Sequence, residues 1–299
     1  MPGFTNTRVP TPSNPSTLPP RYEIRKLKPV HLPWVTAIMA HSHGFHTSVW
    51  NKVWPAEHET GRWTLDMAIT LEYLVRHQID SGLSYGVFDT EYECKTDEAK
   101  AIGGALLWDF DETALHSVEK SQGRAAEGMR LLEQMDFPLV SVVLSYDGYT
   151  PLNQEKMKPL LAAWPEFPIL YGALEKRDQR DPASWKPTGP RQVLMRNATS
   201  TRHDYEGKGI MAATARWLQR EAALMGFRGV QIEAMADPVI HVWTDGAQKP
   251  FQGRVISEFE CETFEDEEGR RPFWPAKQKM AKCWVDLTTT DADASSSQP

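Results

Sequence analysis

Gly207-Lys208-Gly209-Ile210 is the segment of this sequence whose residue types and spacing best suit a chemical task. A short glycine turn that leads into a helix presents several unpaired backbone N–H groups toward one point, and the helix dipole adds partial positive charge there. A phosphate is therefore the expected ligand. Glycine matters because a side chain would hold the anion away from the amides. Arg202 and Lys208 could add positive charge, so the segment predicts a phosphate site, with a plain strand-to-helix turn as the alternative.

Two other phosphate-binding motifs do not fit this loop. No Gly-Lys-Ser/Thr closes it, which excludes the Walker pattern. The dinucleotide fingerprint G-x-G-x-x-G also fails, because Gly207-x-Gly209 is followed by Ala212, although that last position also accepts Ala.

Two titratable side chains follow the loop and are candidates for moving a proton. Glu233 ends a predicted strand, at the edge of an open α/β sheet where ligands gather. Its alternative role is a solvated carboxylate at a strand end. His241 carries an imidazole, the group best suited to proton exchange at neutral pH, and its alternative role is a partly buried helical histidine.

A histidine cluster, His41, His43 and His46, lies in the predicted connector after the first helix. The spacing could suit a transition metal, but no carboxylate or cysteine nearby in the sequence completes such a site, so we predict no metal. Recognition of an acceptor by His43, His46 and the nearby Trp50 is a second interpretation, and a plain loop is the third.

Composition excludes several classes of partner. The formal net charge of −7 disfavours nucleic acid and anionic membranes. No apolar run approaches the roughly 18 residues of a membrane span, and the first residues lack the apolar core of a secretory signal. Three scattered cysteines form no zinc or disulfide pattern, so we expect a cytoplasmic protein. No oligomeric state is indicated.

Periodicity predicts one domain over 21–287, between a disordered lead-in (1–20) and a disordered tail (288–299). Its first half is predicted to contain strands at 22–27, 83–88 and 101–110, the last two forming a hairpin around a charged loop, and helices at 32–39 and 64–79. Residues 111–190 are predicted to be an insertion, with helices at about 125–135 and 153–163.

The second half has a clearer order. A strand at 192–201, the glycine loop, a helix at 210–225 that stops at Gly226 and a strand at 229–233 predict a parallel pair with a right-handed crossover. Later strands are predicted at 255–264 and 282–287. The fold class is therefore α/β, with a mixed central sheet and a helical insertion.

The run from Asp204 to Ile210, with its helix and the following Gly226-Phe227 and strand, resembles the acyl-CoA-binding motif of the GNAT superfamily of N-acyltransferases. That loop has the form Q/R-x-x-G-x-G/A and holds the CoA pyrophosphate on backbone amides. The order of elements upstream is also similar, whereas 111–190 lies outside the resemblance. A narrower resemblance is to fungal members of the superfamily.

The resemblance implies acetyl-CoA as co-substrate, with its pyrophosphate on Gly207, Lys208, Gly209 and Ile210. It also implies that the acyl carbonyl and the pantetheine arm lie along the strand backbone from Thr199 to Thr201.

The sequence departs from the family pattern at several positions. Glu206 replaces the leading Gln/Arg of the loop, and Met211 replaces its closing Gly/Ala. Met195 stands where many members carry a carboxylate base. Thr244 falls where a tyrosine acid is frequent, and Asp237 replaces an Asn. The resemblance of fold is therefore close, and that of catalytic residues is not.

Two functions follow. The first is transfer of an acetyl or similar acyl group from acyl-CoA to an amine of a small-molecule acceptor, with Glu233 or His241 as base. The alternative is a GNAT-fold protein that binds CoA or another ligand without transfer, or that runs different chemistry on an acyl substrate in the same pocket.

Overall fold

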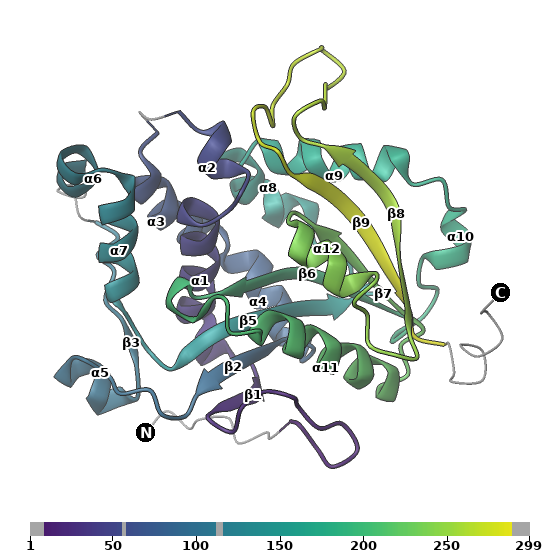
Figure 1. Cartoon of the computed structure of the whole chain (residues 1–299), viewed down its shortest axis with the longest axis horizontal. Coiled ribbons are helices and arrows are strands. Elements are labelled where there is room, and N and C mark those ends of the chain that lie inside the picture. The colour runs from purple at the N-terminus through teal and green to yellow at the C-terminus, as the bar shows by residue number, and fades with distance from the viewer. Residues whose placement is uncertain (1–8, 56–57, 112–115, 289–299) are drawn as a thin grey trace.

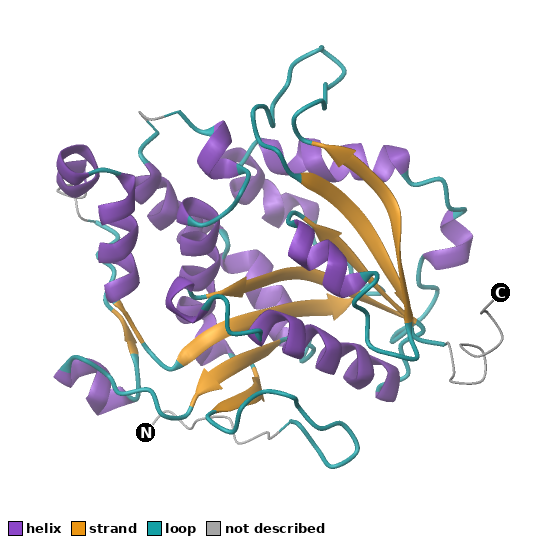
Figure 2. Cartoon of the chain, viewed as in Figure 1, coloured by secondary structure: helices purple, strands orange, loops and turns teal. Residues whose placement is uncertain are grey.

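The computed structural model of the chain describes residues 9–55, 58–111 and 116–288. A seven-stranded sheet with the order β1-β2-β5-β6-β7-β9-β8 forms its centre (Figures 1 and 2). Within it, β6 and β7 run parallel, and the other neighbouring pairs are antiparallel. The strands are β1 (Tyr22–Lys26), β2 (Tyr85–Asp89), β5 (Leu139–Asp147), β6 (Val193–Thr201), β7 (Gly229–Ala234), β8 (Gln252–Glu260) and β9 (Lys279–Asp286).

Helices cover both faces of this sheet. One face carries α1 (Leu32–Phe45), α3 (Thr60–Thr70), α4 (Glu72–Asp80), α8 (Gln154–Ala163) and α9 (Glu166–Arg177), whose apolar side chains share one buried cluster. The other face carries α11 (Ile210–Leu224) and α12 (Asp237–Trp243), which lie in front of the sheet in Figure 1 and belong to a second cluster. Because both faces are covered, the central strands are buried almost throughout.

The remaining elements lie around this core. Among the described residues they are β3 (Ala105–Leu106), β4 (Met135–Asp136), α2 (Trp50–Val53), α5 (Asp97–Ile102), α6 (His116–Gln122), α7 (Arg124–Glu133), α10 (Pro182–Trp185) and the 3₁₀ turns Pro29–His31 and His203–Tyr205. β3 and β4 pair with each other in a separate two-stranded sheet.

The predicted hairpin of 83–88 with 101–110 is wrong. Residues 97–102 form α5, because Thr96 caps its N-terminus through Ala99 N and Gly103 ends it in the left-handed region. The strand that pairs with β2 is β5, which lies within the predicted insertion 111–190. Every residue of β5 except the last is buried, so the strand lacks the alternation of polar and apolar residues that identifies a half-buried strand.

Residues 9–20 also differ from the expected disordered lead-in. The structure places them against α11, where the Asn14 side chain is fully buried. Asn14 Nδ2 donates to Glu221 Oε2 at 2.9 Å, and Asn14 Oδ1 accepts from Arg220 Nε at 2.9 Å. Residues 1–8 and 289–299 lie outside the described residues.

Most other predicted elements are confirmed, with boundaries shifted by a few residues. The helix predicted at 64–79 begins earlier and is divided at Leu71 into α3 and α4. The strand, glycine loop, helix and strand from β6 to β7 form as predicted, as does the parallel pairing. The α/β class with a mixed sheet is confirmed, and the single domain over 21–287 stays a prediction.

We expect Asn14→Ala to lower the free energy of unfolding by about 1–3 kcal/mol, because it removes a buried amide and leaves half-buried partners on α11 without its hydrogen bonds. Denaturant unfolding followed by circular dichroism measures this change. Ser13→Ala is the control, since Ser13 is exposed, and should stay within about 0.5 kcal/mol of wild type. Equal stability of Asn14→Ala and wild type would show that residues 9–20 do not hold α11.

Candidate active site

The parallel strands β6 and β7 separate partway along their length. Their register runs from Val193 opposite Gly229 to Arg196 opposite Ile232 and then stops. Beyond this point β6 stays paired with β5, and β7 with β9. The register between β5 and β6 also shifts, with Leu144 opposite Ala198 and Ser145 opposite Arg196, so that Asn197 is an extra residue. Such a bulge bends the strand, and it coincides with the start of the fork.

A cavity of about 580 Å³ opens at this fork. Its walls include residues 196–201 of β6, residues 232–236 at the end of β7, and residues 205–212 of the glycine loop and the first turn of α11. The far wall comes from α1, α8, α9 and residues 46–50. The structure therefore brings Thr199, Thr201 and the glycine loop into one concave site.

The glycine loop is shaped to leave its amides open. Gly207 and Gly209 both have φ of 73°, which favours glycine, and no atom lies within 4 Å of a Cβ built on either. Gly209 is the N-cap of α11, with no side-chain cap and no acidic residue in the first turn. The first-turn amides are thus not occupied by a capping side chain, and they suit a phosphate.

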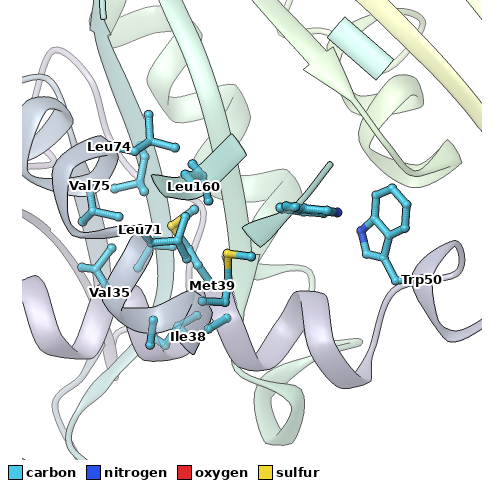
Figure 3. Packing of buried hydrophobic residues seen from close by; sticks show 14 of the residues in the cluster. Val35, Ile38, Met39, Trp50, Leu71, Leu74, Val75 and Leu160 are labelled. Atoms are coloured by element: carbon cyan, nitrogen blue, oxygen red, sulfur yellow. The ribbon is translucent and has the colours of Figure 1, made fainter. Parts of the chain in front are cut away.

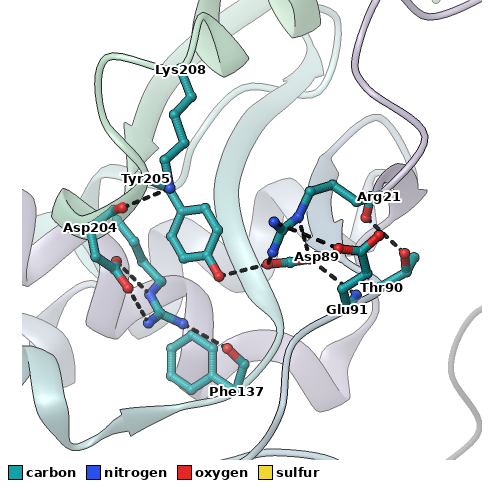
Figure 4. A network of polar contacts seen from close by, with 9 residues as sticks. Arg21, Asp89, Thr90, Glu91, Phe137, Asp204, Tyr205 and Lys208 are labelled. Carbon is teal, nitrogen blue, oxygen red and sulfur yellow. Dashed lines mark hydrogen bonds and ion pairs between the residues drawn. The ribbon is translucent and has the colours of Figure 1, made fainter.

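A polar network anchors this loop to the end of β2 (Figure 4). Tyr205 donates its hydroxyl to Asp89 Oδ2 at 2.7 Å, and Arg21 forms a two-pronged ion pair with the same carboxylate. Burial opposes ionisation of Asp89, but the bonds from Arg21 and Tyr205 outweigh it and lower its pKa. Lys208 Nζ donates to Asp204 O at 3.0 Å. The loop is therefore held in place by Tyr205.

Glu206 and Arg202, the acidic and the basic residue beside the loop, both have hydrogen-bond partners within the protein. Glu206, which should repel a pyrophosphate, accepts from His203 Nδ1 at 3.0 Å. Arg202 is buried and does not line the cavity. Its guanidinium donates to Phe137 O and to both oxygens of Asp204. Three of its N–H groups therefore donate within the protein, and the binding of a phosphate by Arg202 stays a prediction.

Glu233 lines the cavity at the end of β7, on the opposite side of the fork from β6. Burial raises the pKa of its carboxyl, while Lys282 and a bond from Gln231 Nε2 at 3.1 Å oppose that rise. A carboxylate with a raised pKa is a better proton acceptor than an exposed one.

Tyr171 of α9 is a cavity residue that the sequence did not assign to the site. Its hydroxyl accepts from Nδ2 of Asn197, the bulge residue, at 3.4 Å. Gln78 Nε2 donates to Asn197 Oδ1 at 3.1 Å and so fixes the amide orientation. Burial and then Glu233 raise the pKa of Tyr171, which keeps the phenol protonated. No spacing signal links α9 to β6, because the two meet only in the folded chain.

The histidine cluster belongs to α1 and its C-cap rather than to a connector loop. His43 and His46 line the cavity, whereas His41 is buried against Gly128 O. Recognition of an acceptor by His43 and His46 stays a prediction. Burial lowers the pKa of His43 to about 4 and that of His46 to about 3, so both are neutral near pH 7.

Trp50 lines the same wall and is buried. In Figure 3 it lies across from aliphatic side chains of α1, α4 and α8, of which Met39, Leu74 and Leu160 also line the cavity. This wall of the cavity is therefore largely apolar.

His241 is not part of this site. It is exposed on α12 and does not line the cavity, because that side of α12 faces away from the fork. Thr244 is also outside the cavity, where its hydroxyl donates to Ile240 O at 2.8 Å, and Met195 packs near Gly148. Of the two predicted proton acceptors, the structure brings only Glu233 to the fork.

Among the described residues, no group of three or more His, Cys, Asp or Glu side chains could hold a metal ion. Within the same residues, no helix is both long and apolar enough to cross a membrane.

No family model matches this chain, and no curated protein matches it. Several solved structures share its fold, including the two that follow. The C-terminal condensation domain of Ebony, in complex with beta-alanyl-dopamine, is 15% identical with a TM-score of 0.55 over 89% of this chain and 98% of that one. Arylalkylamine N-acetyltransferase 2 from Aedes aegypti is 12% identical with a TM-score of 0.53, over 89% and 99%. At these identities the comparison shows the fold alone, and that fold is GNAT-like.

Proposed function

We propose that this chain transfers an acetyl or similar acyl group from acyl-CoA to an amine of a small-molecule acceptor. The observation that carries this proposal is that the strand fork, the open glycine loop and Glu233 all line one cavity. A backbone loop that suits a pyrophosphate and a fork that admits an extended thioester arm are what an acyl-CoA requires. The name of the mosquito neighbour supports an amine as acceptor. The resemblance to fungal members remains part of this proposal.

Acyl transfer requires a polarised carbonyl, a deprotonated amine and a protonated leaving thiolate. In the proposed reaction, backbone N–H groups of β6 beyond the bulge polarise the carbonyl. Glu233 accepts the proton of the amine, which then attacks the thioester carbon. Tyr171 donates its proton to the departing sulfur, since its hydroxyl oxygen accepts from Asn197 and its O–H remains to act as the donor.

A second function is binding of CoA or another ligand without transfer, or different chemistry on an acyl substrate. The absence of a titratable group at Met195 and Thr244 favours it. The two functions differ in whether an amine becomes acylated, which a panel of amines with acetyl-CoA tests by product mass.

Gly209→Val should weaken acetyl-CoA binding at least tenfold, about 1.4 kcal/mol, because a side chain at the N-cap holds the pyrophosphate away from the amides. Isothermal calorimetry measures the change. Gly226→Val is a matched control, since Gly226 also has a positive φ, at 88°, and open space around its Cβ, but lies beyond the other end of α11. If acetyl-CoA binding were weakened equally in both variants, the cause would be backbone strain and not the loss of contact with the amides.

Glu233→Gln should lower kcat at least 100-fold and leave acetyl-CoA affinity nearly unchanged, because a general base contributes about 10² to 10⁴ in rate. Since burial raises the pKa of Glu233, wild-type kcat/KM should rise with pH through that raised pKa and then level off. In Glu233→Gln, this rise of kcat/KM with pH should be absent. His241→Ala, on the exposed face of α12, is the control and should keep full activity. A full rate in Glu233→Gln would leave water as the proton acceptor.

A further inference from the structure

Arg196 is a buried cation at the point where β6 and β7 separate. Its side chain is 2% exposed, and it lines the cavity. Charged side chains are almost never fully buried unless they are paired. The buried Arg202 and the half-buried Arg180 follow this rule, since Arg202 pairs with Asp204 and Arg180 with Asp178. Arg196 has no ion pair with any carboxylate of the described residues.

The contacts of Arg196 leave part of its guanidinium unused. Nη1 donates to Leu144 O at 2.8 Å and also to Ala198 O, from the two residues that lie opposite each other on β5 and β6 next to the bulge. Nε is buried and has no hydrogen-bond partner. The guanidinium carbon lies 5.9 Å from the centre of the Trp243 ring. Carbonyl oxygens and a ring face carry only partial negative charge, so the full charge of Arg196 is not balanced.

Burial lowers the pKa of Arg196 to about 9, which still leaves it protonated at neutral pH. The carboxylate on the other side of the fork, Glu233, is instead influenced by Lys282 and Arg180. The guanidinium of Arg196, at the point where β6 and β7 separate, therefore carries a positive charge that no carboxylate of the described residues pairs with. A planar guanidinium matches a carboxylate in geometry.

We propose that Arg196 binds a carboxylate carried by one of the two substrates, either on the acyl group of the donor or on the acceptor. This inference rests on the proposed function, because it takes the cavity as the place where both substrates meet. The alternative is that Arg196 only holds the bulge through Leu144 O and Ala198 O.

Binding of matched probe pairs tests this proposal on the full chain at pH 7.5. Succinyl-CoA and butyryl-CoA have equal numbers of acyl carbons and differ in the terminal carboxylate. Tyrosine and tyramine differ in the same way on the acceptor side, and we would titrate them with and without CoA. We expect the wild type to bind the carboxylated member of one pair at least tenfold more tightly. The pair that shows this preference identifies the substrate that carries the carboxylate.

Two substitutions distinguish the role of the Arg196 charge from the role of its hydrogen bonds to the bulge carbonyls. Arg196→Gln keeps a donor for the bulge carbonyls but loses the charge, so the preference should fall below twofold while affinity for the neutral probe changes less than threefold. Arg196→Lys keeps the charge and should retain the preference. Thermal unfolding establishes that both variants are folded.

Three results would overturn the inference: no preference in either pair, a preference that survives in Arg196→Gln, or equal weakening of both members of a pair. Failure of both CoA probes to bind contradicts the proposed function instead. The amine pair without CoA would in that case still decide the role of Arg196.

Discussion

The candidate site depends on the separation of β6 from β7 after Arg196 and Ile232. Each strand keeps its outer neighbour, so the sheet remains intact on both sides of the fork. The bulge at Asn197 bends β6 away where the pairing ends. Because parallel strands need a crossover, α11 begins beside the carboxyl end of β6, at the open end of the fork. One topological feature therefore sets both the fork and the position of the glycine loop.

The sequence allowed this part of the fold to be predicted because its signals are local. A glycine loop, a helix that ends at Gly226 and two short strands lie next to one another in the chain. The strand β5 was missed for a physical reason. It is buried on both faces, so it has no alternation, and its pairing with β2 and β6 joins segments far apart in sequence. A continuous apolar run of this kind does not by itself distinguish a strand from a buried helix.

Several cavity residues could be named from the sequence. Gly207, Gly209 and Glu233 lie on those local elements, and all three line the cavity. His43, His46 and Trp50, which were named from a histidine cluster and a nearby aromatic residue, line it as well. Proximity in sequence does not determine where a side chain points, however. Arg202 turns toward Phe137 and Asp204, and His241 lies on the outer side of α12. Tyr171 comes from α9, which the sequence assigned to an insertion, and its role depends on contacts that exist only after folding.

Desolvation gives the cavity its chemical character. The same burial that keeps His43 and His46 neutral raises the pKa of Glu233. An ammonium group that entered this largely apolar space would also be desolvated, which lowers the pKa of an amine. The two shifts have opposite signs, so the pKa of the donor and that of the acceptor approach each other. Proton transfer from an ammonium to Glu233 is therefore less unfavourable in the cavity than in water, and this favours a free amine there.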